Sequence, residues 1–214
     1  MTPSSEVASS PISVESGNSS NFLRTLAEFL IRRRILLSLL LFIVLIGEDV
    51  VFGSKPHDVL DFRDPISMLG TVLVVSGLAL RTWSVGILRK NRELTTTGPY
   101  RLIRNPLYVG SFMMMFGFCA IIGDGENIWF IVGPVLLMYI VKVRQEERSL
   151  STLFPQQWPE YARQTPRFFP RFGRLDLKAD WSGAQWMRSR EYQAVLATVV
   201  ALVALKIWQA APFY

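Results

Sequence analysis

The sequence predicts an all-α membrane protein, a polytopic helical bundle of about five transmembrane helices. Half of its 214 residues are hydrophobic and only 19% are charged, whereas an ordinary soluble domain has about 25% charged residues. Five apolar stretches approach the roughly 20 residues that a helix needs to cross a bilayer. The segments between these stretches alternate between rich and poor in Lys and Arg, which is typical of membrane topology.

The N-terminal residues 1–21 predict a disordered tail. The first twenty contain eight serines, two prolines and no aromatic residue, too little apolar surface to offset the entropy of ordering. Arg32-Arg33-Arg34 then precede an apolar run at 35–46. A signal peptide has the same order, but its charged region is short and a small-residue cleavage site follows. Because some thirty residues come first, we expect a retained first span and an extracytoplasmic loop within 22–64.

Four further apolar stretches predict spans at about 65–88, 108–122, 128–143 and 194–211. The third and fourth spans of the chain are only 15 and 16 residues long, so we expect them to recruit flanking residues. The glycine-rich turn 123–127 between them predicts an antiparallel helical hairpin.

The distribution of charge predicts the orientation of the bundle. Segments 89–106 and 144–191 carry five basic against one acidic and nine basic against six acidic residues, whereas 48–64 carries two basic and five acidic residues. The positive-inside rule places the N-terminus and both basic segments in the cytoplasm. The net charge of +6 follows from this topology, so we expect a lipid bilayer and no nucleic acid as the partner.

Cysteine and histidine are too scarce for several kinds of site. Cys119 and His57 are the only residues of their types. A single cysteine excludes an intrachain disulfide framework and a cysteine-based metal cluster. A single histidine excludes the usual two-histidine metal sites, so no metal site is predicted.

Two cytoplasmic segments are candidates for the chemistry. Asn105-Pro106 predicts the start of the third span, since Asn is a favoured N-cap and Pro a favoured first residue. Backbone N–H groups at such a start attract anions, and Arg101 and Arg104 lie close in sequence. The alternative is a well-capped span whose interfacial arginines contact lipid phosphates.

Glu146 and Glu147 follow the fourth span. Carboxylates at a helix C-terminus oppose the helix dipole, and anionic lipids repel them, so a compensating partner is expected. The partner is either the arginine cluster at the start of the third span or a cationic ligand; a plain salt bridge is the alternative without function. Arg81 is expected to face the bundle or to snorkel, and Lys206 to snorkel only.

Taken in order, these motifs resemble the isoprenylcysteine carboxyl methyltransferase family and the related phospholipid N-methyltransferases. The resemblance covers about 65–172, roughly half of the chain, and makes this segment a catalytic core, with a cytosolic segment and a last span at 173–214. The residues that carry it are Arg81-Thr82-Trp83, Gly98-Pro99-Tyr100-Arg101, Arg104 to Gly110, Glu146-Glu147, Leu150, Phe154, Tyr161 and Pro166 to Pro170.

The resemblance implies an integral-membrane methyltransferase that binds S-adenosylmethionine without a Rossmann domain, in a pocket facing the cytosol. Helix-start N–H groups and an arginine suit the carboxylate of this cofactor, and the two glutamates suit its positive groups. Asn105 departs from the family, which commonly has His at that position, and the loop 89–94 is short. The cofactor-binding residues implied are Tyr100, Arg104, Asn105, Pro106, Tyr108, Gly110, Glu146 and Glu147.

The acceptor is a membrane-resident lipid or prenylated molecule, and two kinds are open. A prenylcysteine carboxylate is ionised near pH 7 and needs an orienting cation, for which Arg167 is the candidate. A phospholipid amine must lose a proton, and Glu147 or Tyr161 could accept it. Arg167 and Glu147 are thus the catalytic candidates. A non-catalytic membrane scaffold is the alternative class. A transporter is not expected, because no pair of Gly- or Pro-broken spans recurs in two halves of the chain.

Overall fold

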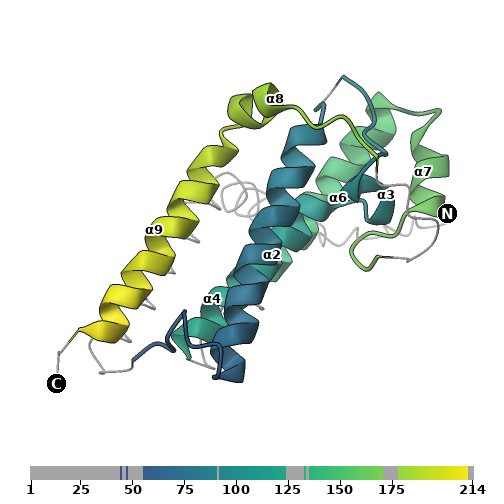
Figure 1. Cartoon of the computed structure of the whole chain (residues 1–214). Coiled ribbons are helices and arrows are strands. Elements are labelled where there is room, and N and C mark those ends of the chain that lie inside the picture. The colour runs from purple at the N-terminus through teal and green to yellow at the C-terminus, as the bar shows by residue number, and fades with distance from the viewer. Residues whose placement is uncertain are drawn as a thin grey trace, which may run out of the picture. The chain divides into compact units, whose positions relative to one another are not determined.

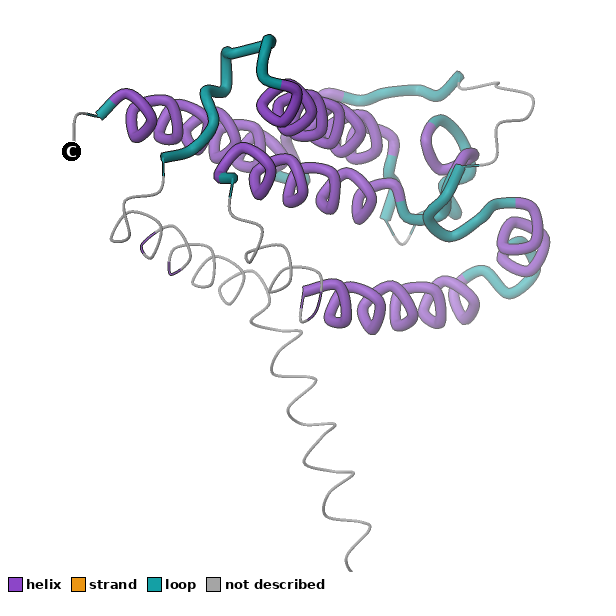
Figure 2. The backbone as a smooth tube through the Cα atoms, turned by 90° about the horizontal axis from the view of Figure 1, so that it is seen from below, coloured by secondary structure: helices purple, strands orange, loops and turns teal. Residues whose placement is uncertain are grey.

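The structure is a computed structural model of the chain that describes residues 44, 47, 55–90, 92–123, 133, 135–170 and 178–211. Within these ranges the chain is all-α, as predicted, and no segment is a strand (Figures 1 and 2). The expected N-terminal tail, nearly all of the first span, most of the turn of the predicted hairpin and the early part of the predicted fourth span lie outside the described residues. The helices are α2 (Pro65–Ile87), α3 (Pro99–Leu102), α4 (Pro106–Ile122), α6 (Leu136–Leu153), α7 (Trp158–Gln164), α8 (Gly183–Arg188) and α9 (Glu191–Ala210).

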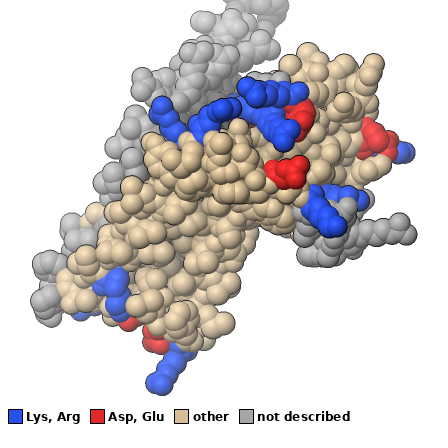
Figure 3. All heavy atoms as spheres, turned by 45° about the horizontal axis from the view of Figure 1, so that its top comes forward, with Lys and Arg blue, Asp and Glu red and all other residues tan. Residues whose placement is uncertain are grey.

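Two of the described helices, α2 and α9, are long and apolar enough to cross a membrane, and α4 is a shorter apolar helix. Figure 3 shows charged side chains gathered toward the ends of the visible face, with an uncharged surface between them. Large apolar side chains are exposed along α2 and α9, and extensive exposed apolar surface is rare on soluble monomers and suits contact with lipid. The exposed side chains on α2 and α9 include Ile66, Met68, Leu69, Val72, Val75, Leu196, Val199, Val200, Val203 and Ile207.

Local signals explain where α2 and α4 begin. The Asp64 carboxylate accepts hydrogen bonds from the backbone N–H groups of Ile66 and Ser67, and a proline follows it at the start of α2. Both features favour a helix start. The chain at α4 has Asn105 at the N-cap, as predicted, followed by Pro106. The Asn105 side chain makes no capping hydrogen bond, however, because it points into the candidate site described below.

Helices α2 and α4 are antiparallel and pack closely through glycines (Figures 1 and 2). A Cβ atom at Gly77 would lie 2.5 Å from the Gly110 carbonyl oxygen, and one at Gly70 would lie 2.9 Å from the Gly117 oxygen. Small residues let helix backbones approach in this way. The pairing fixes the position of α4, and the two residues that precede this helix, Arg104 and Asn105, contribute to the candidate site.

We expect Gly77→Ala to destabilise the protein by about 1–3 kcal/mol, because the new methyl group meets backbone that cannot rotate away. The loss corresponds to a decrease of roughly 3–10 °C in the Tm measured in detergent. Gly183→Ala is the control, since its Cβ would meet Trp181 at an ordinary 3.5 Å. Equal Tm changes for the two variants would contradict the close packing of α2 on α4.

Helix α9 is held to the rest of the bundle by two ion pairs. Arg81 on α2 donates from Nε to Glu191 Oε1 at 2.8 Å and from Nη1 to Ser111 Oγ at 2.5 Å. At the other end of α9, Lys206 Nζ lies 2.6 Å from Asp58 Oδ2. The expectation that Lys206 only snorkels is therefore wrong, because the 57–64 loop presents a carboxylate to it. Arg81 faces the bundle, one of its two predicted positions.

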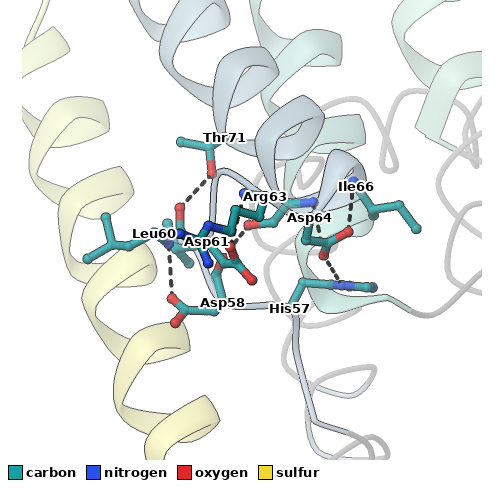
Figure 4. A network of polar contacts seen from close by, with 10 residues as sticks. His57, Asp58, Leu60, Asp61, Arg63, Asp64, Ile66 and Thr71 are labelled. Carbon is teal, nitrogen blue, oxygen red and sulfur yellow. Dashed lines mark hydrogen bonds and ion pairs between the residues drawn. The ribbon is translucent and has the colours of Figure 1, made fainter.

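The 57–64 loop joins the ends of three helices (Figure 4). His57 Nδ1 lies 2.5 Å from Asp64 Oδ2, and the His57 backbone N–H donates to the carbonyl oxygen of Ile121 at the end of α4. Thr71 on α2 donates to the Val59 carbonyl oxygen. Together with the ion pair to α9, these contacts tie α2, α4 and α9 together at this end.

The ion pair of Asp58 predicts a dependence of stability on pH. The hydrogen bond from Lys206 and the Leu60 N–H lower the pKa of Asp58 below its ordinary value of 3.8. A carboxyl with a lower pKa in the folded protein stabilises it above the unfolded pKa, and this contribution is lost as the pH falls through the folded pKa.

We therefore expect the Tm of the wild type to fall below about pH 4, and Asp58→Asn to lower the Tm at pH 7 and weaken its decrease in acid. Thermal melting in detergent between pH 3 and 7 measures this. Asp61→Asn is the control, because the Asp61 carboxylate is exposed and accepts the Arg63 N–H. Identical pH profiles for Asp58→Asn and the wild type would exclude this contribution.

Candidate functional site

The candidate site lies on the part of α6 that continues beyond its apolar half. The helix does not end with the predicted span at 143 but at Leu153, with Phe154 as its C-cap. Residues 144–153 are mostly good helix formers, and Pro155 is the first residue that disfavours helix before it. Glu146 and Glu147 consequently lie inside the helix, and the prediction that they sit at its C-terminus is wrong.

Two segments converge on the carboxylate of Glu147, which is only 8% exposed. Arg104, before α4, places Nη1 3.3 Å from Glu147 Oε1. Arg167, after α7, donates from Nη2 to Oε2 at 2.6 Å and from Nε to Oε1 at 3.0 Å. Paired donors from one guanidinium make the strongest kind of carboxylate contact. The start of α4 and the middle of α6 thus meet as the sequence predicted.

Asn105 contributes the third donor to this carboxylate. Its Nδ2 donates to Glu147 Oε1 at 3.3 Å and to the Arg167 carbonyl oxygen at 3.4 Å. The Arg104 N–H also donates to the Pro166 carbonyl oxygen at 2.8 Å. The segment after α7 is therefore fixed to the start of α4 by backbone and side-chain bonds together.

A cavity of about 560 Å³ opens beside Glu147, within the usual range for small-molecule sites. The Arg104 guanidinium carbon lies 5.9 Å from the centre of the Trp158 ring. Arg104 Nε is buried and has no hydrogen-bond partner among the described residues, which leaves a strong donor available. The residues around the cavity are Arg104, Arg144, Glu147, Arg148, Ser151, Trp158 and Arg167.

Two buried tyrosines connect α7 to α3 near the site. The Tyr161 hydroxyl donates to the Tyr100 carbonyl oxygen at 2.8 Å, while the Tyr100 hydroxyl has no partner in the described part of the chain. Burial raises the pKa of both phenols above their ordinary value of 10. Both phenols therefore hold their protons more firmly than an exposed tyrosine does, and Tyr161 as a proton acceptor stays a prediction.

The other predicted site residues lie outside this convergence. Tyr108 packs edge-on against Tyr139, with ring centroids 5.3 Å apart. Gly110 packs on α2, where a Cβ would lie 2.7 Å from the Gly77 oxygen. Glu146 pairs with Lys142 at 3.9 Å on the more exposed side of α6. Pro106 is fully buried.

Sequence reasoning missed four residues of the cavity wall: Arg144, Arg148, Ser151 and Trp158. The first three recur at positions four and three residues apart, the spacing that places side chains on one face of a helix. That spacing could have identified them once the helix was known to continue. Trp158 begins α7 after the turn that follows α6, and its sequence carries no comparable signal.

Comparison with known proteins finds one family profile and two curated relatives. The phospholipid methyltransferase profile matches residues 66–157. The cobalt-zinc-cadmium resistance protein CzcN of Cupriavidus metallidurans is 33% identical over 164 residues, which cover 74% of each chain. The nickel-cobalt-cadmium resistance protein NccN of Alcaligenes xylosoxydans xylosoxydans is 38% identical over 108 residues, which cover 50% of this chain and 49% of that protein. No solved structure matches the chain significantly.

Proposed function

Because the chain belongs to the phospholipid methyltransferase family, we propose that it is an S-adenosylmethionine-dependent methyltransferase acting on a membrane-resident acceptor. The observation that carries this proposal is the convergence of Arg104, Asn105 and Arg167 on Glu147 beside a cavity. The matched profile, at 66–157, includes the start of α4 and all of α6.

The side chains around the cavity have the charges and shapes that suit the chemical groups of the proposed cofactor. The unsatisfied Nε of Arg104 suits a carboxylate, and Glu147 suits an ammonium or sulfonium group. The Trp158 ring offers a face for a planar base. When bound, the cofactor supplies a methyl group on a positively charged sulfur.

The roles that we propose for the protein side chains are holding and orienting. Methyl transfer needs alignment of donor and acceptor more than it needs acid or base groups. Glu147 holds three donors in place, and the Arg104 side chain beside it is only 15% exposed, so both are fixed before ligands bind. Arg167 is 44% exposed at its side chain and is our candidate for orienting an acceptor that arrives from outside.

We propose that this cavity faces the cytosol. The basic segments predicted to be cytoplasmic, 89–106 and 144–191, come together at the site through Arg104 and Glu147. The acidic 57–64 loop instead contacts the opposite ends of α4 and α9. This sidedness agrees with the positive-inside rule.

The acceptor is proposed to be either a phospholipid amine, which the family profile favours, or a prenylcysteine carboxylate, which the sequence motifs first suggested. Proteoliposomes containing the full chain and methyl-tritiated S-adenosylmethionine separate the two. We expect label in phosphatidylethanolamine or in added N-acetyl-S-farnesylcysteine. Absence of transfer to both, together with absence of cofactor binding, would favour a non-catalytic membrane scaffold.

The names of the two relatives favour a second, cellular role in tolerance to divalent metals. We propose that such a role would act through methylation of a membrane component. Metal-sensitive bacteria producing the wild type should then grow at higher cobalt or cadmium concentrations than bacteria producing Glu147→Gln, with both proteins present at equal levels on immunoblots. Equal growth of the two strains in cobalt or cadmium would show that metal tolerance does not depend on Glu147 and its cavity.

A further inference from the structure

The cavity carries more positive charge than its own carboxylate balances. Four arginines and one glutamate line it, a formal charge of +3. Arg104 and Arg167 are paired with Glu147. Arg144 and Arg148 are exposed and have no ion pair within the part of the chain that the structure describes. They are one helical turn apart on α6, so they project from the same face.

The proposed cofactor does not remove this surplus. It has one carboxylate against an ammonium and a sulfonium group, so it brings a net positive charge into a positive cavity. Arg104, with its unsatisfied Nε, is available for the carboxylate. An additional anion near Arg144 and Arg148 would therefore stabilise the loaded cavity, and the remaining ligand of a methyl transfer is the acceptor.

The position of the two arginines along α6 also points to a membrane ligand. The apolar part of α6 ends at Val143, which is buried. Arg144 and Arg148 lie one and five residues beyond it, about 2–8 Å along the helix axis at 1.5 Å per residue. The polar headgroup layer on each side of a bilayer is about 5–8 Å thick. Both guanidinium groups can thus reach the depth at which lipid-anchored oxyanions lie.

We propose that Arg144 and Arg148 form the subsite for an oxyanion, a phosphate or a carboxylate, carried by the membrane-anchored acceptor. The inference rests on the proposed function and names the acceptor's chemical class. Planar guanidinium groups bind such oxyanions with paired donors. The two arginines select and position the acceptor, while Glu147 and Arg104 serve the cofactor.

The test is the binding of separate probes to the purified full chain in detergent. Dihexanoyl phosphatidylethanolamine supplies the phosphate, N-acetyl-S-farnesylcysteine supplies the carboxylate, and the methyl ester of the latter is a neutral control. Calorimetry with S-adenosylhomocysteine reports the cofactor site independently. The variants are Arg144→Gln/Arg148→Gln, the charge-preserving Arg144→Lys/Arg148→Lys, and Arg163→Gln, an exposed arginine on α7 paired with Glu160.

We expect the wild type to bind at least one of the two probes that carry an oxyanion, and the double glutamine variant to bind that probe at least about tenfold more weakly. The lysine variant should fall between them. Affinity for S-adenosylhomocysteine and for the methyl ester should change less than threefold, and Arg163→Gln should match the wild type. If the double variant does not fold, each single glutamine variant should still lose about threefold.

Three results would overturn the subsite: glutamine variants with unchanged affinity for the oxyanion-carrying probe, a wild type that binds neither oxyanion-carrying probe, or a larger decrease in affinity for S-adenosylhomocysteine than for the oxyanion-carrying probe. The last result would assign both arginines to the cofactor. A wild type that binds an oxyanion-carrying probe but no S-adenosylhomocysteine would instead overturn the proposed methyltransferase function, so the two failures are distinguishable.

Discussion

Glu147→Gln is expected to lower the affinity for S-adenosylhomocysteine by about ten- to a hundredfold. A hydrogen bond to a charged group contributes about 1.5–3 kcal/mol, and the amide cannot replace the negative charge that suits an ammonium group. The substitution also leaves the guanidinium groups of Arg104 and Arg167 without their carboxylate. Isothermal titration in detergent measures the affinity, and circular dichroism checks that the helices are retained.

Glu146→Gln is the matched control for this experiment. The two residues are adjacent on α6, but Glu146 is 38% exposed at its side chain and pairs with Lys142. We expect the affinity of the Glu146→Gln variant for S-adenosylhomocysteine to differ less than threefold from that of the wild type. Equal losses in both variants would point to a general effect of charge, and an unchanged affinity in Glu147→Gln would remove this residue from the cofactor site.

Glu191→Gln is expected to destabilise the protein by about 3 kcal/mol or more. Its carboxylate side chain is 7% exposed and the Arg81 side chain 23% exposed. Removing one partner of a buried ion pair leaves an uncompensated charge and costs about 3–5 kcal/mol. Arg81 lies within α2, where apolar surroundings make that charge harder to solvate. Thermal melting in detergent should show a large decrease in Tm.

A double variant distinguishes the energetic contribution of the ion pair from that of the packing of α9. Arg81→Met/Glu191→Leu removes both charges and keeps apolar volume, and such replacements of buried pairs are often neutral or stabilising. We expect the double variant to recover most of the Tm that Glu191→Gln loses. If the losses of the single Arg81→Met and Glu191→Leu variants simply add in the double variant, the two side chains are not energetically coupled.

The helix starts and the central contact were predictable from sequence because their signals are local or nearly so. Asp64 before a proline and Asn105 before a proline mark the beginnings of α2 and α4. The meeting of Arg104 with Glu147 was expected from a predicted hairpin and from carboxylates assigned to a helix C-terminus, although Glu147 in fact lies inside α6. What the contact binds is still a prediction.

The end of α6 was not predictable from hydropathy, because hydropathy falls at the first charged residue whereas a helix ends only where its backbone must change. That error hid the face formed by Arg144, Arg148 and Ser151.

The ion pair between Arg81 and Glu191 joins residues 110 positions apart. No pattern within one segment indicates which of several carboxylates will reach a given arginine. The same reason explains the wrong expectation for Lys206, whose partner Asp58 is 148 positions away. Such contacts depend on how α9 packs. The sequence of α9 predicts a helix long enough to span a membrane, but it does not predict which helices or loops α9 contacts.

Photolabelling tests most directly whether the cofactor occupies the cavity beside Glu147. The full chain in detergent is irradiated with methyl-tritiated S-adenosylmethionine, with and without excess S-adenosylhomocysteine, and the labelled peptides are identified by mass spectrometry. We predict competable label in peptides from 99–108 or 144–170, which contain Arg104, Glu147 and Trp158. Label confined to the 57–64 loop or α9, or label that S-adenosylhomocysteine does not displace, would contradict a cofactor site between α4 and α6.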